Sequence, residues 1–269
     1  MTNKSNRKST YALITGGSSG IGRAYAERLA ARGYNIITVS NQAEQNAEVA
    51  AHLAEAYGVH AIPLYKDLSA RESATEIYDY CKSEGLEVEI LVNNAGILLF
   101  ATLDKTDTHK IDTAIGLHVY TPTMLCKLFG EEMRKRGRGH ILIMSSATVQ
   151  LAYPTISVYN ATKSYLRNFA DSLRFELRPH GISVTTVYPG AIDTPLYTLE
   201  ERYRRPLRAL GVMMSPDELA RRALKRMFRR RKNYTPGLFT KVVIVLARII
   251  PDRVILWVMR HPKLRHMFA

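Results

Sequence analysis

The chain has 269 residues, with 38 Lys and Arg against 24 Asp and Glu, which gives a formal net charge of +14. Hydrophobic residues make up 46% and charged residues 23%, a balance that excludes a largely disordered chain. The two cysteines, Cys81 and Cys126, fit neither a disulfide framework nor a metal-ligand spacing, so no metal site is expected and a reducing, cytoplasmic compartment is favoured. Residues 1–10 form a polar tail without an apolar run, and no secretory signal is expected.

The positive charge is concentrated in one part of the sequence. Residues 1–200 carry as many basic as acidic side chains, whereas the last 69 residues hold 18 Lys and Arg against 4 Asp and Glu. A basic segment of this kind faces nucleic acid, an anionic membrane surface or water. Nucleic acid is the least favoured of the three, because no nucleic-acid-binding motif accompanies the charge.

Up to residue 190, short apolar runs alternate with longer helical patterns. The predicted strands are 11–15, 35–40, 60–65, 88–92, 140–144 and 182–188. The first predicted helix follows a glycine-rich turn and ends at about residue 32, and the others cover about 42–57, 69–84, 108–135 and 157–178. Apolar, β-branched strands that alternate with helices are typical of a parallel sheet covered on both faces. The sequence therefore predicts one α/β domain over 11–237, a Rossmann-like doubly wound parallel sheet.

The pattern changes after Pro189. A helix is predicted over 216–232, with Ser215 as its N-cap and Pro216 at its first position, and 233–237 is a candidate last strand. The extension 238–269 has an apolar helical stretch that breaks at Pro251, and its charged residues interrupt any run long enough to span a membrane. A lid over the cleft, a subunit interface and a helix lying on an anionic membrane all remain open for it.

A glycine-rich turn joins the first predicted strand to the first helix. It reads Thr15-Gly-Gly-Ser-Ser-Gly-Ile-Gly22, with Gly16 suited to a tight turn, Gly20 to close approach of a pyrophosphate and Gly22 to helix–sheet contact. The N-terminus of the following helix supplies N–H groups and the positive end of a dipole. This turn predicts a dinucleotide phosphate site.

Further motifs follow at the predicted carboxyl ends of the strands, where open parallel sheets bind ligands. They are Asn93-Asn94-Ala95-Gly96, Ser145-Ser146, Tyr159-x-x-x-Lys163 and Pro189-Gly-Ala-Ile-Asp-Thr194. With the glycine-rich turn, this set resembles the short-chain dehydrogenase/reductase family over about residues 11–194. A second Tyr-x-x-x-Lys, at Tyr78, lies ahead of the Asn-Asn-Ala-Gly element and is interpreted as a surface helix face.

The resemblance implies a catalytic set of Ser146, Tyr159 and Lys163. A carbonyl that accepts a hydride needs a proton donor, and a nearby lysine lowers the pKa of a tyrosine that otherwise titrates near 10. Tyr159 is thus the expected acid or base, Lys163 its cationic neighbour and ribose ligand, and Ser146 the residue that orients the carbonyl, with Ser145 ranked second. His118 stands where the family usually has asparagine, and either a part in a proton relay or a buried core histidine fits it.

The choice of cofactor rests on the end of the second strand. An acidic residue there selects NAD(H) and an arginine clamps the 2′-phosphate of NADP(H), but Ser40 and Asn41 occupy these positions. NADP(H) is favoured, because nothing repels a phosphate, with NAD(H) as the alternative and Arg23 as a possible helper. The expected cofactor-binding residues are Gly16, Ser18, Ser19, Gly20, Ile21, Gly22, Ser40, Asn41, Asp67, Leu68, Asn94, Ala95, Gly96, Tyr159, Lys163, Pro189, Gly190, Ile192 and Thr194. Asp67 has a second interpretation, as the cap of the helix that follows.

These motifs predict an oxidoreductase that interconverts a ketone and a secondary alcohol. Members with a basic, apolar C-terminus, such as those resembling 3-ketosphinganine reductases and steroid dehydrogenases, imply a lipophilic substrate. The apolar residues after Thr194, among them Leu196, Tyr197 and Leu199, fit such a substrate and fit internal packing equally. The alternatives are a 3-oxoacyl thioester reductase and a non-catalytic NADP(H)-binding sensor or scaffold at a membrane. The resemblance also implies a homodimer or homotetramer paired through 108–135 and 157–178. The cysteine usage and the basic C-terminal segment predict a place in the cytoplasm, or a peripheral one at the inner face of a membrane.

Overall fold

The computed structural model describes residues 10–150, 154–194 and 201–261. Most of the predicted N-terminal tail, the apolar loop residues Leu196, Tyr197 and Leu199, and the last eight residues of the predicted extension lie outside these ranges. Thr10, expected in the tail, is the buried first residue of the sheet.

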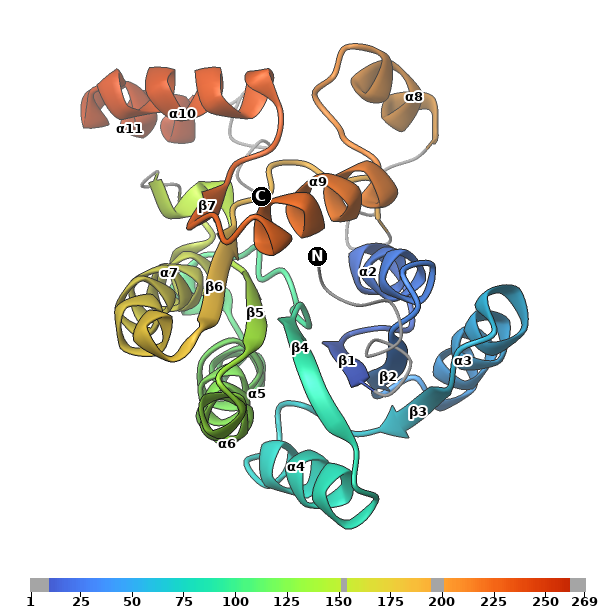
Figure 1. The fold of residues 1–269 in the computed structure, drawn as a ribbon. Helices are drawn as coiled ribbons and strands as arrows, with labels where there is room; N and C mark the ends of the chain where they lie inside the picture. Colours follow the sequence, from blue (N-terminus) through green and yellow to red (C-terminus); the bar gives the residue numbers. More distant parts are fainter. Residues whose placement is uncertain (1–9, 151–153, 195–200, 262–269) are drawn as a thin grey trace.

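A seven-stranded parallel sheet forms the centre of the molecule (Figure 1). Its strands are β1 (Thr10–Thr15), β2 (Asn35–Ser40), β3 (Ala61–Tyr65), β4 (Glu87–Asn93), β5 (Gly139–Met144), β6 (Ile182–Val187) and β7 (Asn233–Tyr234). They pair in the order β3-β2-β1-β4-β5-β6-β7, and every pairing is parallel. The predicted doubly wound fold is confirmed, including the short last strand.

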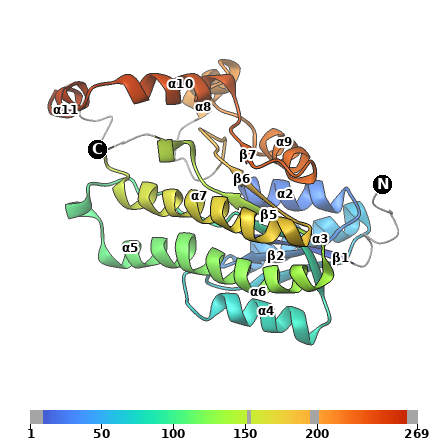
Figure 2. The ribbon, with the colours of Figure 1, turned by 60° about the vertical axis from the view of Figure 1, so that its left-hand side comes forward.

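Helices cover both faces of the sheet (Figure 2). One layer holds α2 (Gly20–Ala30), α3 (Ala43–Tyr57) and α9 (Pro216–Phe228), and the other holds α4 (Ser73–Ser83), α5 (Thr108–Ile115), α6 (Thr121–Arg136) and α7 (Ser157–Leu177). The strands β1, β2, β4, β5 and β6 supply both cores, because alternate side chains point to opposite faces: Ile14 packs with Leu29, and its neighbour Leu13 lies in the core that contains Leu166.

The helix predicted over 108–135 is divided. A π-helical turn, η2 (Gly116–Tyr120), separates α5 from α6. A Cβ on Gly116 would lie 2.3 Å from the carbonyl oxygen of Ser69, so only glycine lets this turn approach the loop after β3. The interruption falls on the segment that carries His118, and such turns are frequent at functional sites.

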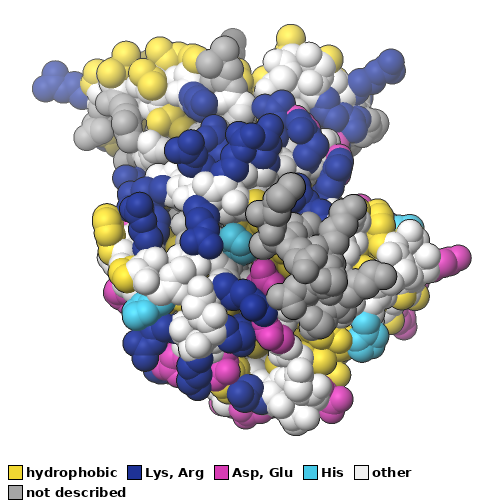
Figure 3. Space-filling model, in the orientation of Figure 1, with side chains coloured by type: hydrophobic (Ala, Val, Ile, Leu, Met, Phe, Trp, Pro, Cys, Tyr) yellow, Lys and Arg dark blue, Asp and Glu magenta, His cyan; other side chains and the backbone are white. Residues whose placement is uncertain are grey.

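The remaining elements lie outside the two layers. They are the short turns η1 (Leu103–Lys105), η3 (Ala147–Gln150) and η4 (Arg178–His180), and the helices α8 (Glu201–Ala209), α10 (Leu238–Ile249) and α11 (Asp252–Arg260). Helix α10 packs against η3, and Figures 1 and 2 show α10 and α11 projecting from the body of the molecule. In the space-filling view, apolar side chains cover their outer edge and a band of Lys and Arg lies between them and the sheet domain (Figure 3). No helix within the described ranges is both long and apolar enough to cross a bilayer.

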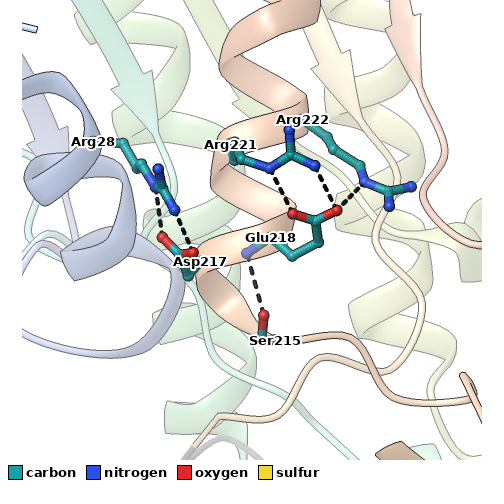
Figure 4. Close-up of polar contacts among 6 residues, drawn as sticks. All are labelled: Arg28, Ser215, Asp217, Glu218, Arg221 and Arg222. Carbon is teal, nitrogen blue, oxygen red and sulfur yellow. Dashed lines mark hydrogen bonds and ion pairs between the residues drawn. The ribbon is translucent and has the colours of Figure 1, made fainter.

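Helix α9 begins with the predicted cap and is held by ion pairs (Figure 4). The Ser215 side chain accepts a hydrogen bond from the Glu218 amide at 3.2 Å. Arg28 of α2 binds both carboxylate oxygens of Asp217, while Glu218 pairs with Arg221 and Arg222 on its own helix. Both carboxylates of α9 are therefore engaged at its N-terminal end, where acidic groups favour the helix dipole.

Candidate active site

A cavity of about 360 Å³ opens at the carboxyl edge of the sheet, beside the ends of β1, β2, β3 and β4. Thirteen of the predicted cofactor-binding residues line it: Gly16, Ser18, Ser19, Gly20, Ile21, Ser40, Asn41, Asp67, Leu68, Asn94, Ala95, Gly96 and Thr194. Gln42, Lys66, Ser69, Ile97, Thr113 and Leu117 line it as well. The cavity thus gathers residues that are almost 180 positions apart in the sequence.

The glycine-rich turn has the backbone that its sequence predicts. Gly16 and Gly20 have φ values of 66° and 51°, which favour glycine, and α2 starts at Gly20. A Cβ on Gly22 would lie 1.8 Å from the Gly16 carbonyl oxygen, so this glycine is required for close packing and does not itself line the cavity. The Ser19 side chain makes no capping hydrogen bond, so it does not occupy the N–H groups at the N-terminus of α2.

Thr15 and Asn94 join the ends of β1 and β4. The Thr15 hydroxyl accepts hydrogen bonds from the amides of Asn94 and Ala95 at 2.9 and 3.0 Å. The Asn94 side chain donates to the Thr15 carbonyl at 3.0 Å. Thr15 was not among the predicted site residues, although its place as the last residue of a buried strand could have singled it out.

Hydroxyl and amide groups surround the end of β2. The Ser18 hydroxyl donates to Gln42 at 3.1 Å and lies 2.9 Å from the Ser40 hydroxyl, which also accepts from the Gln42 amide. Asn41 lies beside them and is exposed. No carboxylate is among the partners of Ser18 and Ser40 in these contacts.

Lys66 brings a positive charge to this end of the cavity, and sequence reasoning missed it. Its ammonium is 2.7 Å from Glu76 of α4, and its side chain is 35% exposed. Its position next to Asp67 was the available signal. Arg23, suggested as a helper, instead binds Glu27 one turn along α2 at 2.8 Å and does not line the cavity.

Asp67 shapes the turn after β3. One of its oxygens accepts from the amide and the hydroxyl of Ser69, at 2.9 and 2.7 Å. Helix α4 starts at Ser73 rather than at 69, because residues 67–72 form this turn first. The interpretation of Asp67 as the direct cap of the following helix is therefore replaced by a role in the turn before it.

The two adjacent serines at the end of β5 have different surroundings. Ser145 donates to the Lys163 carbonyl at 2.8 Å, a bond within the core. The Ser146 oxygen accepts from both the amide and the hydroxyl of Thr148, at 3.2 and 2.9 Å. Because a hydroxyl has two lone pairs and one proton, these bonds leave the proton of Ser146 for another acceptor.

Tyr159 and Lys163 face each other one turn apart on α7. The Lys163 ammonium lies 5.8 Å from the centre of the Tyr159 ring and donates to the Met144 carbonyl at 3.2 Å. Burial lowers the pKa of Lys163 to about 8, which still leaves the amine mostly protonated at neutral pH. By contrast, Tyr78 of the second Tyr-x-x-x-Lys packs against Phe129 and binds Glu132, away from this site.

His118 is fully buried beside this pair, and its contacts define its tautomer. Nε2 accepts from the amide of Ile97 at 3.0 Å, so the ring proton is on Nδ1, which donates to Thr162 at 2.9 Å. The Thr162 hydroxyl in turn donates to the Tyr159 carbonyl at 2.8 Å. Burial, and next the charge of Lys163, hold the pKa of His118 well below its usual value. Both nitrogens are occupied by protein groups, which favours the core-histidine interpretation over the relay.

The segment after β6 closes the site. The Pro189 carbonyl accepts from the Ala147 amide at 2.9 Å, and Ile192 is buried against Met214. Gly190 lies under Thr240 of α10, since a Cβ on it would be 2.4 Å from the threonine hydroxyl. Asp193, to which the sequence assigned no role, binds Arg204 and Arg208 at 3.0 and 2.7 Å and so fixes α8 beside the cavity.

Of the predicted site residues, Gly22, Pro189, Gly190 and Ile192, together with the four catalytic candidates His118, Ser146, Tyr159 and Lys163, do not line the main cavity. Lys163 is next to it all the same, because a Cβ on Gly96 would lie 3.3 Å from its ammonium nitrogen. Within the described ranges, no three His, Cys, Asp or Glu side chains are grouped so as to hold a metal ion.

Comparison with known proteins finds oxidoreductases among the sequences similar to this chain. The chain is 34% identical to a very-long-chain 3-oxoacyl-CoA reductase of Anas platyrhynchos over 69% of its own length and 61% of the reductase. It is 29% identical to a 17-beta-hydroxysteroid dehydrogenase type 3 of Danio rerio over 96% of its length and 81% of that enzyme. The match therefore spans about three fifths of the reductase.

Two further findings identify the family. A short-chain dehydrogenase from Sphingobium yanoikuyae, solved in complex with NADPH, has 28% identity and a TM-score of 0.76 over 90% of this chain and 97% of its own. The family described as short chain dehydrogenase matches residues 10–203. These residues include β1 to β6 and every predicted catalytic side chain, and on this evidence the chain belongs to the short-chain dehydrogenase family.

Proposed function

We propose that the chain is an NADP(H)-dependent oxidoreductase that interconverts a ketone and a secondary alcohol. The observation that carries this proposal is the position of Tyr159 beside the buried ammonium of Lys163, which lies behind Gly96 in the wall of the cavity. A protein that only binds a dinucleotide has no need of a proton donor next to a cation that is costly to bury.

The residues present fit a dinucleotide. The bare N-terminus of α2 and the positive-φ glycines suit a pyrophosphate, and the cavity continues from there to Ser40 and Lys66 at the end of β2 and β3. Lys66 supplies the charge that a 2′-phosphate requires, which supports NADP(H) over NAD(H). The relative solved with NADPH supports the same choice.

The bound cofactor supplies or accepts the hydride, and the protein manages the proton. Tyr159 donates its phenolic proton to the carbonyl oxygen in reduction and takes it back in oxidation. The Lys163 charge favours the phenolate and so lowers the tyrosine pKa towards the working pH. Ser146 donates its remaining proton to the same oxygen and stabilises the negative charge that develops there. We assign His118 to positioning, because its hydrogen bonds join the β4 loop to the turn that carries Tyr159.

The substrate is proposed to be lipophilic. Among the relatives, one is named for very-long-chain 3-oxoacyl-CoA and another for a 17-beta-hydroxysteroid, both with an apolar skeleton next to the reacting carbonyl. A 3-keto lipid and a steroid are the leading classes, and a 3-oxoacyl thioester is the alternative that the first relative favours.

The experiment follows the loss of nicotinamide absorbance with NADPH or NADH and three ketone classes: a 3-ketosphinganine, a 3-oxoacyl thioester and keto steroids. Turnover on one class, faster with NADPH, is expected. Tight NADPH binding without turnover on any ketone would instead support the sensor or scaffold.

We also propose a homo-oligomer formed through α6 and α7. These helices border a second cavity of about 360 Å³, and α7 exposes Tyr165 and Phe175. Sedimentation equilibrium tests this, and a monomer at micromolar concentration would refute it.

Finally, we propose a cytoplasmic protein in peripheral contact with an anionic membrane, and the surface that carries this contact is identified next.

A further inference from the structure

Exposed apolar side chains are concentrated on the C-terminal helices. Ten of the eighteen exposed large apolar residues among the described parts of the chain lie between 239 and 257: Phe239, Val242, Val243, Val245, Leu246, Ile249, Ile250, Val254, Leu256 and Trp257. Ile249 is 72% exposed and Trp257 is 59% exposed. A contiguous apolar surface of this kind marks an interaction site in a soluble protein.

Helix α10 has little contact with the rest of the molecule. Among the described side chains of α10, Ile244 is the one large apolar residue that is buried, and Thr240 packs on Gly190. With twelve residues it is about 18 Å long, which is short of the roughly 30 Å hydrocarbon core of a bilayer. It can therefore lie on a membrane but not cross one.

Basic residues flank this apolar surface. In the sequence, no acidic residue occurs between Glu218 and Asp252, whereas Lys225, Arg226, Arg229 and Lys241 are exposed there. The acidic residues of α9 are already paired with arginines (Figure 4). In Figure 3 the dark blue band runs directly below the apolar edge.

We propose that the α10–α11 face docks on the surface of an anionic lipid bilayer. Its apolar side chains enter the boundary between headgroups and acyl chains, and the basic band contacts the lipid phosphates and carboxylates. A second copy of this chain is the less suitable partner, because pairing the same face would bring two basic bands together. An anionic bilayer offers an apolar interior and the opposite charge at once.

Docking of this face would also orient the catalytic site. Helix α10 packs against η3, which directly follows Ser146, and Thr240 covers Gly190 at the end of β6. The carboxyl edge of the sheet therefore lies on the membrane side. If the proposed function holds, a lipophilic ketone passes from the bilayer to Tyr159 without crossing bulk water. The docking itself does not depend on catalysis.

The chain offers a direct probe, because Trp257 of α11 is its single tryptophan. Intrinsic fluorescence of the full chain is recorded with phosphatidylcholine vesicles, with and without phosphatidylserine, at low and high salt. We expect a blue shift with phosphatidylserine vesicles that weakens as salt rises, since screening removes the attraction between charges.

Paired variants separate the two contributions. Leu246→Glu with Ile249→Glu changes two exposed side chains and is expected to abolish the blue shift. Tyr57→Glu, which changes an exposed side chain at the C-terminal end of α3, is the control that preserves it. Lys241→Glu with Arg253→Glu is expected to weaken vesicle binding about tenfold or more. Lys82→Glu on α4 reverses a charge away from the face and is expected to leave binding nearly unchanged.

Three outcomes would overturn the proposal. They are an unchanged Trp257 spectrum with phosphatidylserine vesicles, equal binding to uncharged vesicles at all salt concentrations, and a dimer that dissociates when Leu246 and Ile249 are replaced. Reduction of a water-soluble ketone without vesicles is measured in parallel. Activity without docking would reject only the membrane face, and docking without activity would reject only the enzyme.

Discussion

The two lysines of the site differ in what surrounds them. Lys163 is 5% exposed, is held by a backbone carbonyl and has its pKa lowered to about 8 by burial. The side chain of Lys66 is 35% exposed and pairs with Glu76. Proton transfer by Tyr159 requires a fixed, desolvated charge next to the phenol, which Lys163 supplies. Recognition of the cofactor by Lys66 requires only a charge within reach of a phosphate. Variants of the residues around Lys163 should therefore lower kcat, and variants of Lys66 should weaken cofactor binding.

The largest effect is expected for Tyr159→Phe. It removes the proton donor and keeps the ring that packs near His118, so kcat should fall by about 10²–10⁴-fold. The affinity for NADPH, measured by fluorescence titration, should change little. A comparable loss of NADPH affinity would show that Tyr159 acts mainly in binding.

The next largest effect separates the two neighbouring serines. Ser146→Ala should lower kcat about 10²-fold, because it removes a donor to the developing oxyanion. Ser145→Ala should leave kcat nearly intact and lower the free energy of unfolding by about 1 kcal/mol, because its bond to the Lys163 carbonyl is internal. Urea denaturation and steady-state rates on both variants test this, and exchanged outcomes would reverse the assignment.

At the end of β3, Lys66→Ala should weaken NADPH binding about tenfold and leave NADH binding unchanged, since only NADPH has the 2′-phosphate. Titration with 2′,5′-ADP and with 5′-AMP gives the same comparison without the nicotinamide. Lys127→Ala, which breaks a surface ion pair with Glu131, is the control. Equal loss for both nucleotides would place Lys66 near the pyrophosphate instead.

The smallest effect concerns His118 and pH. Its pKa is lowered in the folded protein, so below its usual value of about 6.5 the unfolded chain takes up a proton that the folded chain does not. Stability is therefore lost as pH falls, by about 1 kcal/mol between pH 7 and 5.5 for this residue. The free energy of unfolding of His118→Asn, measured by urea denaturation, should therefore fall less over that pH range than that of the wild type. His140, with a pKa lowered to about 4, contributes equally to both proteins. Parallel curves would show that His118 is not buried neutral.

Much of this site could be predicted from local patterns. The order of strands and helices and the residues at the strand ends followed from hydrophobic periodicity and from glycine, and both act within a few residues. Lys66 was missed because its place in the cavity depends on how β2 and β3 lie together, a relation between distant segments. The turn at Gly116 was missed because the reason for it, contact with Ser69, is also long-range. Helix α8 was not predicted because its charged sequence shows no apolar stripe, and Asp193 holds it through Arg204 and Arg208.

The most direct test of the proposed catalysis uses NADPH in which deuterium replaces both hydrogens on the nicotinamide carbon that transfers hydride. Mass spectrometry of the product alcohol is expected to show deuterium bound to carbon with the wild type and almost none with Tyr159→Phe at equal cofactor occupancy. A product without deuterium, or transfer by Tyr159→Phe at the wild-type rate, would contradict the assignment of hydride transfer to this cavity and of the proton to Tyr159.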